Sequence, residues 1–290
     1  MRQIDSYLSA SKRRFIGSFH ALKYESICRI WYYFPLFIAF SIMPLMRYKL
    51  KISYDGSCYG GWQVQPNAIS IQQLIQNALQ IALRSPIDLT GSSRTDAGVH
   101  ALGQIAHFSS ADCDPKRLLA SLNGLLPKDI RILSIEPVDE AFHARYSATS
   151  KTYHYHIDTA PWPSPFTRTY SMHVPFPLNT SLIQKAKDYL IGTHDFSAFA
   201  CEAHSGNAAR NPIRTLTRIA IIQDGSKMRM EFEANGFLYK MVRSLVGTLL
   251  DVGSGKTSPE EIPHILNSKD RRRAGPCAPP HGLFLVNICF

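Results

Sequence analysis

Alternating apolar and polar residues mark where the folded part of the chain begins. Over residues 48–54 every second side chain is apolar, which indicates a half-buried strand. From Ser70 apolar residues recur at helical spacing as far as Ala82, and Gln73 stands where a capping box places it. The next patterns predict strands at residues 87–90, 104–108 and 130–138, and a helix at residues 115–123. The resulting order, β-α-β-β-α-β, is that of a split βαβ unit.

The same order returns in the second half of the chain with different residues. Asp224-Gly225 lies between two alternating runs and is a strong hairpin signal. The expected elements are strands at residues 151–157, 213–222, 227–234 and 283–289 and helices at residues 181–191 and 237–252. The patterns therefore predict an α+β protein with two similar halves, residues 46–138 and 139–290. Their mixed or antiparallel sheets are expected to abut and form a central cleft.

Residues 1–45 do not resemble the rest of the chain. Residues 30–46 contain no charged side chain, and several basic residues precede them, as in a signal anchor. The run is short for a membrane span, which needs about 20 apolar residues, and Pro35 and Pro44 interrupt it. A membrane anchor, a targeting segment and a non-native or disordered extension remain open. We expect the extension, because Met46 immediately precedes the first predicted strand, and so we expect no stable membrane association.

The net positive charge of the chain indicates which kinds of partner it can bind. The 290 residues include 45% hydrophobic residues, enough for a sizeable core, and carry a formal net charge of +10. Residues 1–45 hold six Lys or Arg and two Asp or Glu, so the remainder keeps a net charge of +6. A basic protein suits a polyanion such as nucleic acid, and it also suits a membrane surface.

Cysteine and histidine spacing argues against a metal. None of the six cysteines forms a C-x-x-C pair, and the histidines show no zinc spacing. We expect reduced thiols, no metal and a cytoplasmic protein. Residues 253–257 read GSGKT, as at the end of a P-loop, but Leu250 stands where that motif needs Gly.

Residues 91–108, GSSRTDAGVHALGQIAHF, carry the candidate chemistry. Asp96 lies among turn-forming residues, with Arg94 two positions before it. A nearby cation favours the ionised carboxylate, and an ionised, oriented carboxylate can act as a nucleophile or a base. The simpler interpretation is a tight turn between two strands. The whole run is more specific than a turn requires.

These residues resemble the signature of the tRNA pseudouridine synthase A (TruA) family. The resemblance covers the chain from Met46 onward, and Ser93 is a departure because the family usually carries Gly there. The matching motifs are Arg94-Thr95-Asp96-Ala97-Gly98-Val99-His100-Ala101, Gly103-Gln104, Tyr54-Asp55-Gly56, Gly61-Trp62-Gln63, Ser70-Ile71-Gln72, Phe142-His143-Ala144-Arg145, Ser147-Ala148-Thr149, Tyr153-His154-Tyr155, Met241-Val242-Arg243 and Gly282-Leu283-Phe284-Leu285.

The resemblance implies an isomerase that converts uridine to pseudouridine in the anticodon stem-loop of tRNA, at positions 38 to 40. Asp96 is then the catalytic residue, either as a nucleophile or as the base that forms a glycal intermediate, and the sequence does not separate the two. Arg243 is expected to pair with Asp96, Tyr153 to stack on the uracil, and Arg94 to help displace the nucleotide. The resemblance also implies an RNA-binding cleft, a homodimer and no cofactor.

Two alternatives remain at this stage. One is a non-catalytic RNA-binding protein on the same fold, which the presence of Asp96, Tyr153 and Arg243 together disfavours. The other is a membrane-anchored variant of the enzyme that uses the apolar run before residue 46.

Overall fold

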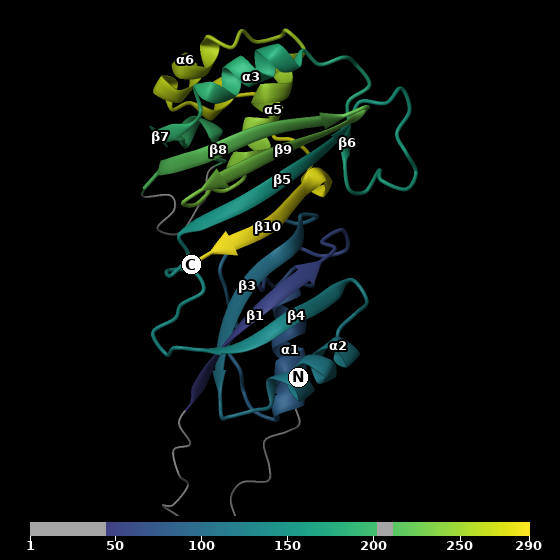
Figure 1. The fold of residues 1–290 in the computed structure, drawn as a ribbon, viewed down its shortest axis with the longest axis vertical. Coiled ribbons are helices and arrows are strands. Elements are labelled where there is room, and N and C mark those ends of the chain that lie inside the picture. The colour runs from purple at the N-terminus through teal and green to yellow at the C-terminus, as the bar shows by residue number, and fades with distance from the viewer. Residues whose placement is uncertain (1–44, 202–210) are drawn as a thin grey trace, which may run out of the picture. The chain divides into compact units, whose positions relative to one another are not determined.

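The computed structural model describes residues 45–201 and 211–290 (Figure 1). The interpretation of residues 1–45 as an extension lies, except for Leu45, outside the described residues. Among the described residues, no helix is long and apolar enough to cross a membrane.

The first half of the described chain has the predicted order of strands and helices. Every second residue of the first strand, from Tyr48 to Tyr54, is buried, and Ser70 Oγ caps the first helix by accepting from Gln73 N–H at 3.3 Å. The elements are β1 (Met46–Tyr54), α1 (Ile71–Leu83), β2 (Thr90–Gly91), β3 (His100–Ser110), α2 (Pro115–Leu125) and β4 (Ile130–Val138).

The second half contains the predicted elements and three short ones that were not predicted, β6, β7 and α6. The first two are too short to show a period, and α6 carries a proline. The elements are β5 (Ser150–Asp158), β6 (Met172–His173), α3 (Thr180–Asp188), β7 (Gly192–Asp195), β8 (Ile213–Asp224), β9 (Lys227–Ala234), α5 (Met241–Gly253), α6 (Glu261–Ser268) and β10 (Leu283–Cys289).

The two sheets do more than abut, because they join edge to edge. The strand order is β4-β1-β3-β10-β5-β9-β8-β7, with β2 on β3 and β6 on β5. Figure 1 shows β10 between β3 below and β5 above. The β3–β10 pair is parallel and the main path is otherwise antiparallel, so the expected α+β fold with a mixed sheet is confirmed.

The register at this junction brings the two halves together at one point. Ala101 of β3 pairs with Leu285 of β10, and Leu285 pairs with Tyr153 of β5. The loop that precedes β3 therefore lies beside Tyr153, although the two are far apart along the chain.

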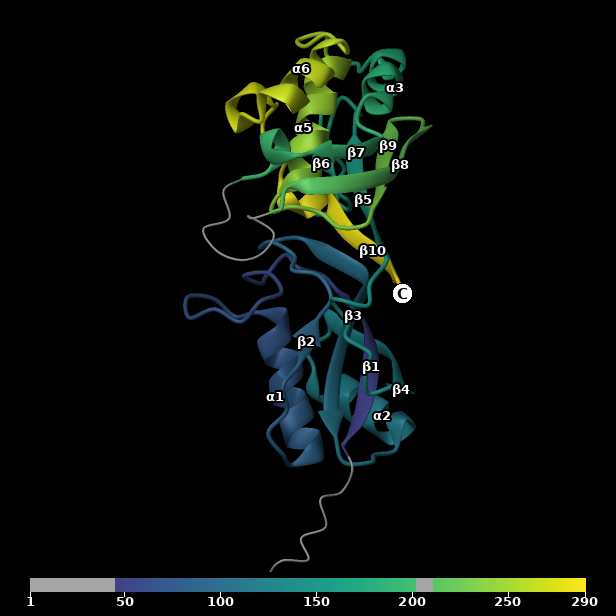
Figure 2. The same ribbon diagram turned by 90° about the vertical axis from the view of Figure 1, so that its left-hand side faces the viewer.

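Helix α5 provides a rigid support in the second half. All residues from Ser244 to Leu250 are buried, including the polar Ser244 and Thr248. Figure 2 shows α5 among the other helices and the strands of the second half. The segment that leads to β10 packs directly on it: a Cβ at Gly247 would lie 1.7 Å from Pro276 O, so only glycine fits there. Gly275 N–H also donates to Thr248 Oγ1 at 2.8 Å.

Candidate active site

The Asp96 loop contains a tight turn, as its sequence indicates. Val99 N–H donates to Asp96 O at 3.1 Å, and Gly98 has φ +77°, the left-handed conformation that a type II turn requires at its third residue. Two bonds from Thr95 hold the loop to the first half. Its carbonyl accepts from Trp62 N–H at 3.1 Å, and its hydroxyl lies 2.8 Å from Tyr54 OH. The turn is therefore the frame that presents Asp96.

His100 fastens the end of this loop to the second half. Its Nδ1 accepts from Gly56 N–H at 3.1 Å, and its Nε2 lies 3.2 Å from His281 O. Burial is the main effect on this ring and lowers the pKa of His100, so the imidazole is neutral near pH 7 and Nε2–H donates to His281 O. Asp55 Oδ1 lies 3.1 Å from Nδ1, but with a neutral ring this contact is not an ion pair. His100 is therefore a buried residue that links the loop to both halves.

Asp96 and Arg243 form the expected ion pair. Arg243 Nη1 donates to Asp96 Oδ2 at 2.8 Å, and the two side chains are 12% and 19% exposed. Arg243 is itself fixed, because its Nε donates to Ala278 O at 2.7 Å and its carbonyl accepts from Ala278 N–H at 3.0 Å. Within the described part of the chain, Asp96 Oδ1 has no hydrogen-bond partner. One carboxylate oxygen is thus held while the other is free to react.

Helix α5 begins at Met241, later than the pattern suggested. Lys240 precedes the helix with φ 58° and is therefore not one turn before Arg243 on a helical face. The apolar residues before Lys240 continue the helical spacing, which is why the pattern predicts an earlier start. The left-handed conformation of Lys240 prevents the helix from extending back through them. Arg243 consequently lies in the first turn of α5.

Tyr153 is a buried phenol close to Asp96. Its side chain is 5% exposed, its ring meets Phe237 edge-on with centroids 5.1 Å apart, and its hydroxyl lies 2.9 Å from Ser93 Oγ. Burial raises the pKa of Tyr153 to about 12; the Asp96 charge adds to the rise and the Ser93 hydrogen bond opposes it. The phenol is therefore protonated at neutral pH, and in this conformation a base can reach only a small part of the ring.

Arg94 does not contact Asp96, although it is two residues away. Its side chain is exposed and has no ion pair or hydrogen bond to any described residue. The cation that faces the carboxylate is Arg243, from the other half of the chain. Arg94 is instead free to contact a ligand.

Two further side chains, Lys151 and Gln104, support the loop, and the sequence patterns did not assign this role to either. Lys151 Nζ donates to Ser92 O at 2.7 Å. Gln104 holds Ser93 on both sides, accepting from its N–H at 3.3 Å and donating to its carbonyl at 2.6 Å. The available signals were the position of Gln104 in the motif and the spacing of Lys151, which lies two residues before Tyr153 on the same strand face.

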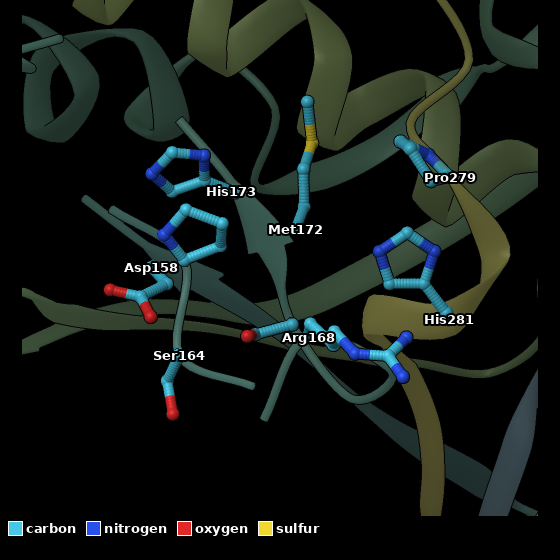
Figure 3. A pocket seen from close by; sticks show the side chains of 9 residues that line it. Asp158, Ser164, Arg168, Met172, His173, Pro279 and His281 are labelled. Carbon is cyan, nitrogen blue, oxygen red and sulfur yellow. The ribbon is translucent and has the colours of Figure 1, made fainter. Parts of the chain in front are cut away.

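One cavity in the described part of the chain does not have Asp96 in its lining. It has a volume of about 250 Å³, and Asp158, Arg168, Met172, His173 and His281 are among the residues that line it (Figure 3). Neither Asp96, Tyr153 nor Arg243 does so. The one carboxylate in its lining, on Asp158, is paired with Lys227 and accepts from Ala160 N–H at 3.1 Å, so it is already satisfied. Asp96 Oδ1, in contrast, has no hydrogen-bond partner among the described residues.

The side chains that commonly bind metal ions are His, Cys, Asp and Glu. Within residues 45–201 and 211–290, no cluster of three or more His, Cys, Asp or Glu side chains has the arrangement of a metal site.

The Asp96 carboxylate, with one oxygen held and one without a partner among the described residues, lies beside a protonated buried phenol, and such groups suit nucleophilic or acid–base chemistry. Comparison with known sequences identifies the enzyme class. The chain belongs to the tRNA pseudouridine synthase family, whose model matches residues 51–147 and 186–290.

Individual relatives agree with this assignment over most of the chain. The chain is 54% identical to tRNA pseudouridine synthase A 1 of Protochlamydia amoebophila over 84% of this chain and 96% of the relative. It is 45% identical to tRNA pseudouridine synthase A of Thermoanaerobacter sp., over 83% and 98%. It is 42% identical to that of Chlamydia muridarum, over 83% and 91%.

A solved structure titled "Crystal Structure of a Cbf5-Nop10-Gar1 Complex" is 13% identical and covers 70% of this chain and 54% of that chain. The TM-score is 0.31, which is too low to establish a shared fold.

Proposed function

We propose that this protein isomerises uridine to pseudouridine in tRNA, in the anticodon stem-loop at positions 38 to 40, with Asp96 as the nucleophile. Membership of the family and the names of the relatives support the reaction and the substrate. The observation that carries the role of Asp96 is the state of its carboxylate: Arg243 holds Oδ2, while Oδ1 has no partner among the described residues.

The reaction balances within the nucleotide. The C1′–N1 bond breaks, the uracil turns, and a C1′–C5 bond forms; C5 loses a proton and N1 gains one. No atom or electron is left over, so the reaction requires no cofactor. Attack of Asp96 Oδ1 on C1′ releases the uracil, and reattachment through C5 frees the carboxylate. Arg243 orients Asp96, Tyr153 holds the base, and Arg94 helps to displace the nucleotide from its stack.

Cations around the loop suit the RNA backbone. Arg94 and Arg145 are exposed, and neither of them nor Lys151 has an acidic partner among residues 45–201 and 211–290. Burial, together with the charges of Arg145 and Arg214, lowers the pKa of Lys151 to about 8. A phosphate nearby would favour the charged form of Lys151, so RNA binding and protonation of this side chain support one another.

We further propose that the protein is cytoplasmic and forms a homodimer, the oligomeric state that the family resemblance implies. Light scattering coupled to size exclusion measures the oligomeric state directly. A monomer at working concentration that is fully active would contradict this part of the proposal.

The deciding experiment uses purified protein and an unmodified tRNA transcript. Pseudouridine is located by mass spectrometry in three substrates in which the uridine at position 38, 39 or 40 is replaced by cytidine. Asp96→Asn is expected to bind tRNA and form no pseudouridine. Asp88→Asn is the matched control, because Asp88 is an exposed aspartate in the same half. RNA binding without turnover by the wild-type protein would favour the alternative, a non-catalytic RNA-binding protein.

A further inference from the structure

Ser93 and Tyr153 are hydrogen-bond partners at the centre of the site. Their hydroxyl oxygens lie 2.9 Å apart, and each hydroxyl has no other hydrogen-bond partner among the described residues. Tyr153 is 5% exposed, and a buried hydroxyl requires a partner. We propose that Ser93 is a positioning residue, which sets the orientation of the Tyr153 hydroxyl during isomerisation. The proposal rests on the function proposed above.

The Ser93 hydroxyl is itself held in place by the backbone that carries it. Gln104, whose side chain is fully buried, bonds both the N–H and the carbonyl of Ser93. The carbonyl of the preceding residue, Ser92, accepts from Lys151 Nζ. Because Lys151 and Tyr153 lie on the same face of β5, this strand fixes both the serine segment and the phenol that the serine contacts.

The pair permits two arrangements of protons. If the Tyr153 hydroxyl donates to Ser93 Oγ, its proton points at the serine and not at the nucleotide. If Ser93 donates, its O–H occupies a lone pair on the phenol oxygen, and the Tyr153 proton can point toward the reacting nucleotide. The second arrangement presents a protonated phenol, at a fixed angle, close to Asp96. Without the serine hydroxyl, the packed ring stays in place, but the phenol O–H has no hydrogen-bond partner among the described residues to fix its direction.

The hydrogen bond between Ser93 and Tyr153 occurs at the position where this chain departs from the family pattern. Where that pattern has Gly, no side chain can reach the tyrosine hydroxyl, so Ser93 adds a group to the site. Ser93 does not require the left-handed conformation that favours glycine. Alanine can therefore replace it without backbone strain, which makes the hydroxyl testable by itself.

The test is a double-mutant cycle in single-turnover conversion of tRNA. Ser93→Ala is expected to slow conversion about fivefold, the scale of one neutral hydrogen bond, with KM and tRNA affinity changed less than about twofold. Ser93→Ala added to Tyr153→Phe is expected to cause no further loss, because the serine then has no hydroxyl to orient. Ser93→Thr, which keeps a hydroxyl, should recover most of the rate.

Ser92→Ala is the matched control. Ser92 is the adjacent buried serine, and its Oγ has no hydrogen-bond partner among the described residues. This variant should turn over at the wild-type rate, alone and with Tyr153→Phe. Denaturant unfolding of all variants separates a slower reaction from a less stable fold. Ser93→Gly serves as a second deletion and should show the same coupling as Ser93→Ala.

Two results would overturn the role of Ser93 while leaving the proposed function intact. One is a Ser93→Ala enzyme as fast as wild type. The other is a full fivefold loss that persists in the Tyr153→Phe background, since the serine would then act on something other than the phenol. A wild-type protein that forms no pseudouridine would instead overturn the proposed function, and the role of Ser93 with it.

Discussion

Replacing Arg243 by Met tests whether the Asp96 carboxylate must be held for the proposed reaction. Met fills much of the same volume, but it removes two hydrogen bonds at once, from Nη1 to Asp96 and from Nε to Ala278 O. We expect the protein to fold and bind tRNA and to react much more slowly. Arg243→Lys should also be impaired, because the single nitrogen of Lys does not reproduce the planar, spaced donors Nε and Nη1 that bond Ala278 O and Asp96.

The structure sets the size of both effects. Removing one member of a fully buried ion pair costs about 3–5 kcal/mol. Because Asp96 is 19% exposed and water can reach it, we expect a smaller loss of unfolding free energy, about 1–3 kcal/mol, the cost of unsatisfied polar groups. Loss of a preorganised electrostatic contact in an active site lowers kcat by about 10²–10³, and we expect a decrease of that order here.

Single-turnover conversion, tRNA binding and denaturant unfolding are measured together on the same preparations. Arg272→Met is the control: Arg272 also pairs with an aspartate, Asp270, but the Arg272 side chain is 89% exposed. Exposed pairs contribute little, so this variant should match wild type in rate. An Arg243→Met enzyme within about twofold of the wild-type rate would refute the argument that the pair orients Asp96.

Three further predictions concern the phenol, pH and the first 45 residues. Tyr153→Phe should lower the single-turnover rate by about 10²–10⁴ if its hydroxyl transfers a proton, with unchanged tRNA affinity, whereas Tyr153→Ala should weaken both rate and affinity. Burial, with smaller effects from His143 and Arg47, lowers the pKa of His107 to about 4. As the pH is lowered, the imidazole of the unfolded chain therefore binds a proton at a higher pH than that of the folded chain. The free energy of unfolding should fall as the pH drops from ~6.5 to ~4, and His107→Gln should reduce this fall in denaturant titrations. A chain that starts at Met46 should be soluble and as active as the full chain in the same tRNA assay, and aggregation of the shorter chain alone would show that the first 45 residues contribute to the fold.

Local patterns predicted the elements well where they were long and regular. The alternation over residues 48–54 and the cap at Ser70 depend on neighbouring residues alone, and both are present in the structure. The start of α5 was misjudged because apolar spacing does not reveal that Lys240 takes a left-handed conformation.

The assembly of the site could not be derived from local patterns. Asp96 and Arg243 are 147 positions apart, and their pairing was expected only from the family resemblance. The contact between Ser93 and Tyr153 depends on the register of β3, β10 and β5, which hydrophobic periodicity does not specify. Ser93 was noted only as a departure, since nothing near it in the chain indicates that a tyrosine hydroxyl lies within reach.

The central position of β10 has a consequence for synthesis of the protein. Its two neighbours in the sheet, β3 and β5, leave the ribosome well before it does, so the nascent chain carries two unpaired strand edges. Such edges invite pairing with other chains. Ala278, which accepts a hydrogen bond from Arg243, also emerges after Asp96, so the contacts that hold the Asp96 carboxylate are completed late in synthesis. Ribosome-stalled chains that lack β10 should therefore be protease-sensitive and inactive, and they should gain both protection and activity when this strand emerges.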